Sequence, residues 1–321
     1  MRLYPRLVCT LLAIGAAAAE CVGQTYPTRP LRMLVGYAPG GGTDIIARLM
    51  ALHLQPRLGQ PVIVENRPGA GGNIASEQTA RAVPDGYTIL MAANTIAINP
   101  FLSSNKTFDV ATELTGVALI CNSPILVVVN PSLPVHTIAE LIAHAKANPG
   151  RLSYGTPGIG TPQHLATELF QSMTKTTLVH IPYKGGAQAV ADVAGGQLQL
   201  SFAATSSAAP LVQAGRLRAL ATGGAQRAET VKDVPTVGET VSGYNVGIWY
   251  GIMAPANMPR AAIERLHHEL AAIVAMPEVQ ERMFAQGFEH AVSTPEAMTR
   301  LVRDDLAKWE RVVREAGIKP E

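Results

Sequence analysis

The chain has few cysteines. Only Cys9, Cys21 and Cys121 occur in 321 residues. The first two lie in an N-terminal segment that we expect to be removed, so Cys121 is the one cysteine certain to remain in the mature chain. A lone cysteine supports neither a disulfide framework nor a cysteine-rich metal site. Cys121 also lacks a local nucleophile signature, and we expect no cofactor.

The chain also lacks an excess of charge of either sign. It has 26 basic and 24 acidic residues, and leaving out Arg2 and Arg6 near the start makes the two counts equal. No basic surplus remains to neutralise nucleic-acid phosphates or an anionic membrane surface. Both are therefore excluded as main partners, while 47% hydrophobic and 16% charged residues are typical of a globular protein.

Long apolar runs are missing except near the N-terminus. There, Arg2 and Arg6 precede the apolar run from Leu7 to Ala19, which is too short to span a bilayer. Residues 1–24 are therefore predicted to be a secretory signal peptide, which implies export from the cytoplasm. A lipid anchor at Cys21 is an alternative, but Glu20 is a poor residue before a lipid-attachment site, so we favour cleavage without an anchor.

Glycine is abundant, and Gly36 to Asp44 contains three in a row. The stretch follows an apolar run and precedes a helical pattern, so it is predicted to join a strand to a helix start. Backbone amides at a helix N-terminus attract anions. The spacing resembles a phosphate loop, but Gly42 replaces the lysine, which argues against a nucleoside triphosphate site. Two interpretations of this loop remain: it binds a smaller anion, or it is a tight turn without a ligand.

A second loop of the same kind lies at Gly155 to Leu165, again between a short strand and a helical pattern. Asn94 follows another predicted strand, and Ile125–Val129, which is rich in β-branched residues, is predicted to be a buried strand. Strands that alternate with helices predict parallel sheets, and the length predicts two lobes. Two amide-rich loops facing each other would hold an anion between the lobes.

Several side chains near these loops have two interpretations. Asp44 could contact a ligand, but its place in a first helical turn favours capping. His164 and Glu168 have helical spacing, yet no third ligand matches and no metal site is predicted. Tyr37 and Tyr183 could line the ligand site or simply pack. No nucleophile elbow is present, so no catalytic residue is predicted.

The order of short motifs along the chain resembles one family. These are Tyr26-Pro27 with Arg29-Pro30, Pro39 to Asp44, Glu65 to Gly72, Pro84 to Thr88, Gly158, Gly160-Thr161, His164-Leu165, Pro182 to Gly185, Asp192 with Gly195 to Gln197, Trp249, Gly251, Ala254-Pro255, Lys308-Trp309 and Ala316-Gly317. Over nearly the whole mature chain they are similar to the Bug/TctC family, the periplasmic solute-binding proteins of tripartite tricarboxylate transporters.

The resemblance implies an α/β fold, a two-lobed periplasmic binding protein of type II. Each lobe would be a mainly parallel sheet flanked by helices, with the ligand cleft between lobes. Residues 25–124 and 245–321 would form lobe 1, and residues 125–244 lobe 2. Family members bind small carboxylates through main-chain amides and waters at the two loops. The predicted ligand-binding residues are Tyr37, Pro39, Gly40, Gly41, Gly42, Thr43, Asp44, Asn94, Thr156, Gly158, Gly160, Thr161, His164, Tyr183 and Ala204.

The resemblance also implies two integral membrane transporter subunits as partners, and a di- or tricarboxylate as ligand. Ala203-Ala204 departs from the family pattern, because many relatives have an acidic residue there. An acidic amino acid is therefore less favoured as ligand. A sensor that feeds a signalling system is an alternative to a transport receptor. A secreted enzyme acting on a small organic acid is a third hypothesis, but it needs an acid–base pair that the loops lack.

Overall fold

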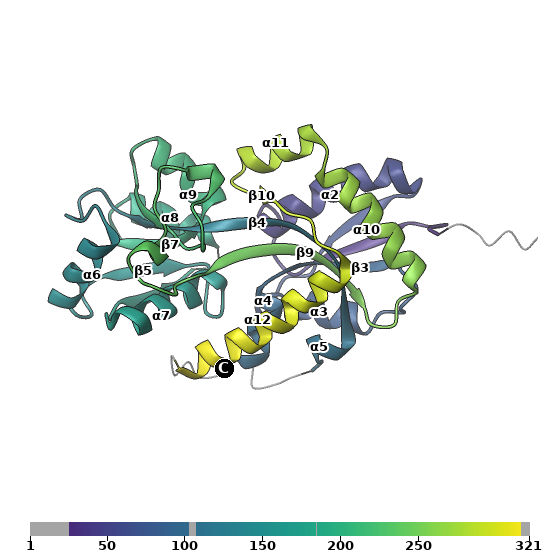
Figure 1. Ribbon diagram of the computed structural model, residues 1–321, viewed down its shortest axis with the longest axis horizontal. Coiled ribbons are helices and arrows are strands. Elements are labelled where there is room, and N and C mark those ends of the chain that lie inside the picture. Colours follow the sequence, from purple (N-terminus) through teal and green to yellow (C-terminus); the bar gives the residue numbers. More distant parts are fainter. Residues whose placement is uncertain (1–25, 103–106, 184, 316–321) are drawn as a thin grey trace, which may run out of the picture.

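A single strand, β4 (Leu114–Val129), runs through both parts of the molecule. The computed structural model describes residues 26–102, 107–183 and 185–315. The sequence predicts a strand only from Ile125, but β4 has 16 residues, a length of roughly 50 Å at about 3.3 Å per residue. Figure 1 shows β4 and β9 (Gly247–Pro255) passing between two lobes.

Lobe 1 contains the first and last parts of the described chain. Its strands are β1 (Leu31–Val35), β2 (Val62–Asn66), β3 (Thr88–Ala93), residues 114–124 of β4, β9 and β10 (Glu289–His290). Its helices are α2 (Gly42–Leu58), α3 (Asn73–Ala80), α4 (Thr95–Ile98), α5 (Val110–Glu113), α10 (Arg260–Val274), α11 (Pro277–Ala285) and α12 (Pro295–Glu315), with the short 3-10 helices η1 (Ala70–Gly72) and η2 (Asn99–Phe101).

Lobe 2 is built from the middle of the chain. Its strands are residues 125–129 of β4, β5 (Ser153–Thr156), β6 (Val179–Pro182), β7 (Leu200–Ala204) and β8 (Arg218–Thr222). Its helices are α6 (Ile138–Ala147), α7 (Pro162–Thr174), α8 (Gly186–Ala194) and α9 (Thr205–Gln213), with η3 (Glu229–Val231) and η4 (Val237–Glu239).

The strands form one curled, mixed sheet in the order β2-β1-β3-β9-β4-β7-β5-β6, with β8 and β10 paired to β4 off this path. Within lobe 1, β1, β2 and β3 are parallel, and within lobe 2, β5, β6 and β7 are parallel. Antiparallel pairs involve β4 and β9, which join the lobes. The pairing of β4 changes from β9 at Pro124 to β7 at Ile125.

The carboxyl ends of the parallel strands in the two lobes face each other. β3 and β4 both run antiparallel to β9, so β3 points along β4 toward lobe 2. β7 runs antiparallel to β4 and ends where Ala204 pairs with Ile125, so it points toward lobe 1. Ligands in open α/β sheets bind beyond the carboxyl ends of strands. We call this region the junction edge.

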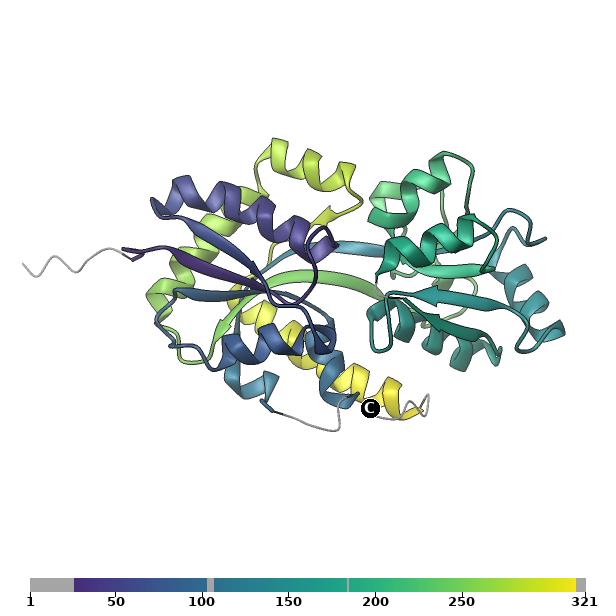
Figure 2. The same ribbon diagram turned by 180° about the vertical axis from the view of Figure 1, so that it is seen from behind.

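Successive residues of a strand point to opposite faces of the sheet, and in lobe 1 both faces are buried. Met33 and Val35 of β1 belong to the hydrophobic cluster that includes residues of α2. Leu34 between them belongs to a second cluster, with residues of α3 and α12. Near-continuous apolar runs in strands are therefore buried between two helical layers, as Figures 1 and 2 show.

The predicted α/β fold class is confirmed. The exact lobe boundaries, residues 25–124 with 245–321 and residues 125–244, stay a prediction. The predicted signal peptide, residues 1–24, and the alternative anchor at Cys21 lie outside the described residues.

Candidate functional site

The predicted ligand residues come from loops that follow five strands. Tyr37 and residues 39–44 follow β1, Asn94 follows β3, residues 158–164 follow β5, Tyr183 follows β6 and Ala204 ends β7, while Thr156 is the last residue of β5. All of these positions are therefore at the junction edge. The lobes also touch there, because a methyl group built on Gly160 would lie 2.6 Å from Cδ1 of Leu102 in lobe 1.

Asp44 holds the loop after β1 in place. The residue is 3% exposed, and its carboxylate accepts hydrogen bonds from Gly40 N at 2.9 Å, from Arg48 Nε at 3.0 Å and from Asn66 Nδ2 at 2.9 Å. Burial alone would raise the pKa of Asp44, but these bonds outweigh it and hold the pKa below its usual value. The N-cap is Gly41, so Asp44 stabilises the loop from inside the first turn.

The loop after β1 presents unused backbone donors. Gly41, Gly42 and Thr43 N–H have no acceptor among the described residues, because the first intrahelical bond is donated by Ile45 N to Gly41 O at 3.0 Å. Gly41 is exposed with φ −80°, and Gly40 has φ +85°. The helix dipole of α2 adds a partial positive charge at these amides.

Tyr37 makes hydrogen bonds within lobe 1. Its hydroxyl donates to Gly71 O at 2.9 Å and also bonds Thr95 Oγ1. Burial raises the pKa of Tyr37 to about 12, although the bond to Thr95 acts in the opposite direction. The hydroxyl is thus already paired with protein atoms.

A loop that we did not predict as part of the site, Gly69 to Gly72, packs beneath the loop after β1. Ala70, Gly71 and Gly72 have successive φ values of +46°, +62° and +99°, and Asn99 Nδ2 donates to Gly71 O at 2.9 Å. A methyl group on Gly36 would lie only 2.6 Å from Gly72 Cα. The glycine run was visible in the sequence, but its contact with Gly36 depends on β1 pairing with β2.

The loop after β5 satisfies most of its own donors. Gly158 N donates to Thr156 Oγ1 at 3.2 Å, Gly160 N to His164 Nδ1 at 3.2 Å, and Thr161 N to Gly158 O at 3.4 Å. Thr161 is the N-cap of α7 and accepts from His164 N at 3.4 Å. The two loops that look alike in sequence therefore differ in how many amides they leave free.

Asn94, Tyr183 and Ala204 complete the predicted set. Asn94 Nδ2 donates to Gly247 O at 2.9 Å, while its buried Oδ1 has no partner among the described residues. Such an acceptor can take a bond from a ligand hydroxyl or a water. Tyr183 donates its hydroxyl to Asp192 at 2.6 Å. Ala204 is the N-cap of α9 and makes no side-chain cap, so a second helix start faces the edge.

Among the described residues, positive charge at this edge comes from helix starts rather than from basic side chains. Arg48 is the basic residue nearest the first loop by its contacts, and it is bonded to Asp44 and to Asn66 Oδ1. Within the described ranges no group of three metal-ligating side chains comes together. The arrangement suits an anion small enough to be held by backbone amides.

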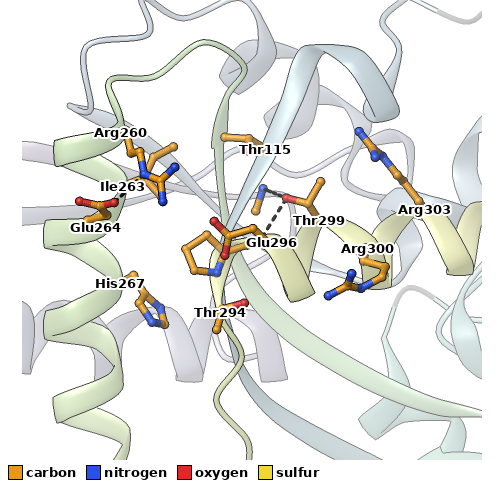
Figure 3. A pocket seen from close by; sticks show the side chains of 12 residues that line it. Thr115, Arg260, Ile263, Glu264, His267, Thr294, Glu296, Thr299, Arg300 and Arg303 are labelled. Atoms are coloured by element: carbon orange, nitrogen blue, oxygen red, sulfur yellow. Dashed lines mark hydrogen bonds and ion pairs between the residues drawn. The ribbon is translucent and has the colours of Figure 1, made fainter.

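A cavity of about 710 Å³ lies elsewhere in lobe 1, between α10, the start of α12 and the beginning of β4. It opens beside Thr115 and Gly116 near the start of β4. Gly116 precedes Ile125, where β4 reaches the junction edge, by nine residues, a distance of roughly 30 Å at about 3.3 Å per residue. Figure 3 shows Glu296 between Arg260 and Arg300, and Arg260 is paired with Glu264 at 2.6 Å. The other two arginines of the lining, Arg300 and Arg303, are exposed, and exposed charges contribute little to binding. We therefore assign the ligand site to the junction edge.

Comparison with known proteins identifies the family of this chain. The family model for the tripartite tricarboxylate transporter family receptor, TctC, matches residues 46–318. The chain belongs to this receptor family. Protein BugT of Bordetella pertussis is 35% identical over 313 residues, which covers 96% of this chain and 95% of BugT. The resemblance predicted from the sequence motifs is therefore confirmed.

Solved structures of the same kind have this receptor's fold. A structure described as R. palustris Rpa4515 with adipate has a TM-score of 0.85 at 35% identity, covering 92% of this receptor and all of that chain. The periplasmic binding protein BugD has a TM-score of 0.82 at 34% identity, with coverage of 92% and 100%. MatC from Rhodopseudomonas palustris with bound malate has a TM-score of 0.77 at 26% identity, with coverage of 90% and 100%.

The family settles the general class of the protein. It is a solute-binding receptor and not an enzyme, as the sequence analysis predicted, and receptors of this family are periplasmic. In the described ranges, no helix combines the length and apolar character that a membrane crossing requires.

Proposed function

We propose that this receptor captures a small organic dicarboxylate between lobes 1 and 2 and delivers it to two integral membrane transporter subunits. One carboxylate of the ligand binds the free backbone amides at the start of α2. The loop after β5 and the start of α9 form the opposite wall.

The observation that carries this proposal is the set of free amides at Gly41, Gly42 and Thr43. They lie in one helical turn, at the positive end of a helix of 17 residues, and an Asp44 network holds the turn rigid. Several amide bonds to one carboxylate need no lysine or arginine beside it, because bonds to a charged acceptor are stronger than neutral ones.

The names of two relatives support a dicarboxylate. The structure with adipate shares 35% of its sequence with this receptor, and the one with malate shares 26%. Both are dicarboxylic acids of short chain length, one with and one without a hydroxyl group. The unpaired Asn94 Oδ1 gives this receptor an acceptor for such a hydroxyl.

The described edge offers no carboxylate for a ligand ammonium group. β7 ends in Ala203 and Ala204, and the carboxylate of Asp44 is already bonded by Arg48, Asn66 and Gly40. An amino acid would bury its charge without a partner, which is costly. We therefore expect dicarboxylates without an amine to bind more tightly than aspartate or glutamate.

Thermal unfolding with a panel of ligands tests the proposal. Adipate, malate, citrate, benzoate and aspartate are added separately to purified mature receptor. A ligand at a hundredfold excess over its Kd stabilises by about 2.7 kcal/mol, which raises Tm by roughly 5 °C in a protein of this size. No shift with any carboxylate, using folded and ligand-free protein, would contradict the proposal.

A Gly41→Val variant tests the position of the site. Gly41 has φ −80° and its Cβ would meet only Ala38 O, at 3.7 Å, so the substitution should not disturb folding. The new side chain would obstruct the amides, and affinity measured by calorimetry should fall about tenfold or more. Gly195→Ala, at the end of α8 in ordinary contact distance of its neighbours, is the matched control and should bind like the wild type.

A further inference from the structure

Three rings are stacked beneath the loop after β5. Tyr154 of β5 and His180 of β6 have ring centroids 4.9 Å apart, and His180 and His164 of α7 have centroids 4.2 Å apart, with 20° between planes in both pairs. Tyr154 and His164 are buried and His180 is half-buried. His180 was not among the predicted site residues, because nothing in its local sequence links it to His164.

Each imidazole holds a different part of the loop. His164 Nδ1 accepts from Gly160 N at 3.2 Å, and His180 Nε2 lies 2.6 Å from Thr156 Oγ1. Thr156 Oγ1 in turn accepts from Gly158 N at 3.2 Å. The two rings therefore fix both ends of the segment 156–160, the same segment that meets Leu102 of lobe 1.

The hydrogen bond to Gly160 requires a neutral His164. A ring nitrogen that accepts a backbone N–H carries no proton, so the proton of His164 must be on Nε2. A second proton on Nδ1 would place two donors against each other and would repel a charged His180 at this stacking distance. The pKa of each ring is lowered to about 4, by burial in both cases and, for His164, also by the neighbouring His180.

One charged group near the rings acts in the opposite direction. Glu168 of α7, which accepts from the Tyr154 hydroxyl at 2.6 Å and from Gln171 at 2.8 Å, lies 3.8 Å from His164 Nε2 and attracts a charged ring. Burial and the neighbouring His180 outweigh this attraction, because the pKa of His164 is lowered. Tyr154 itself stays protonated, because burial raises its pKa. Besides each other, these are the titratable groups that the described contacts place against the two rings.

We propose that His180 and His164 are positioning residues for ligand capture, which shape the loop of residues 156–160 only while both rings are uncharged. Protonating His164 takes the acceptor away from Gly160 N, and a charge on the stacked His180 adds repulsion between the rings. This loosens the wall that lobe 2 presents to lobe 1 and weakens carboxylate binding in acid. This inference rests on the proposed function for its effect on binding, but its effect on the loop does not need a ligand.

The first test follows the loop directly in ligand-free receptor. An NMR titration from about pH 7.5 to about pH 3.5 records the Gly160 amide and both imidazoles, for which an unperturbed midpoint would be near 6.5. We expect all three to change together and well below that value. If the imidazoles titrate near 6.5, or if Gly160 does not follow them, the proposal is wrong, whatever the receptor binds.

The second test measures binding of adipate or malate, whichever stabilises the receptor, by calorimetry over the same pH range. His180→Phe keeps a stacked ring but loses the bond to Thr156, and should bind about tenfold more weakly at neutral pH. His180→Gln keeps an uncharged donor, so it should bind within about threefold of the wild type at neutral pH. Its affinity should also fall less than that of the wild type toward pH 4.

Protonation of the ligand affects the wild type and His180→Gln equally, so it cancels in the ratio of their affinities at each pH. His268→Gln, an exposed residue of α10 in lobe 1, is the control and should follow the wild type throughout. If His180→Gln loses affinity in acid as steeply as the wild type, a role of His180 in the acid response is excluded. If the wild type binds no carboxylate of the panel while Gly160 still follows the imidazoles, the proposed function fails, but the role of the two histidines in shaping the loop stands.

Discussion

The loops after β1 and β5 have similar sequences but are stabilised by different chemistry. The first is held by an ionised carboxylate, Asp44, with Arg48 and Asn66 around it, and leaves its helix-start amides free. The second is held by neutral groups, two imidazoles and two threonine hydroxyls, and uses its amides internally. A glycine-rich loop before a helix therefore does not by itself indicate a free anion site. The residues that support the loop decide this.

The largest effect is expected from removing the charged support. Asp44→Ala removes the buried carboxylate that accepts from Gly40 N, Arg48 Nε and Asn66 Nδ2, and the loss of hydrogen bonds to a charged group should cost about 2–3 kcal/mol in unfolding free energy. Chemical denaturation measures this loss. Thr161→Ala removes the neutral cap of α7 and should cost only about 1 kcal/mol. Equal losses in the two variants would show that the lobes do not differ in this way.

Glycines at the strand ends offer a second comparison. The Cβ of Gly36→Ala would lie 2.6 Å from Gly72 Cα, which is backbone and cannot move aside. The Cβ of Gly155→Ala would lie 2.7 Å from Cδ1 of Leu198 and 2.9 Å from Cβ of Ala189, and the leucine can rotate away. In denaturant titrations we expect Gly36→Ala to lower the free energy of unfolding by about 2 kcal/mol and Gly155→Ala by about 1 kcal/mol. The reverse order would contradict the packing described between β1 and β2.

The two lobes should also respond to acid at different pH. The folded-state pKa values of His164 and His180 lie near 4, below the value of about 6.5 for free histidine, so the unfolded chain binds more protons between these values. The stability that the two neutral histidines contribute to lobe 2 is therefore fully present above about pH 6.5 and is lost as the pH falls toward 4. Asp44 has a lowered pKa, so its contribution is lost only at still lower pH.

Melting curves across this range separate the two contributions. His180→Phe should flatten the decline in Tm between about pH 6.5 and pH 4. Asp44→Asn should leave the shape of that interval unchanged and flatten the decline below it. A wild-type Tm that is constant down to pH 4 would contradict the neutral histidine pair.

The smallest effects concern the two tyrosines. Tyr37→Phe loses bonds to Gly71 and Thr95 and should destabilise by about 1.5 kcal/mol, whereas Tyr183→Phe loses one partly exposed bond to Asp192 and should cost about 0.5 kcal/mol. Because both hydroxyls are bonded to protein atoms, ligand affinity should change less than about threefold. A larger loss of ligand affinity, measured by calorimetry, would show that these hydroxyls contact the ligand.

Much of the architecture was predictable because it depends on local chemistry. Glycine and threonine after short apolar strands marked the loops at Gly36 and Gly155, and apolar spacing gave α2 within three residues of its start. Order and spacing of motifs identified the family. The first part of β4, from Leu114, was missed because its pairing partner β9 lies more than 120 residues away in the sequence.

What the sequence determined by itself is the class of this protein: an α/β receptor with helix starts at the carboxyl ends of its strands. What only the tertiary structure decided is which amides are free. Asn66 reaches Asp44, and His180 reaches Thr156, through pairing of neighbouring strands. Hydrogen bonds between residues distant in sequence depend on register and side-chain direction, and neither can be read from a local pattern.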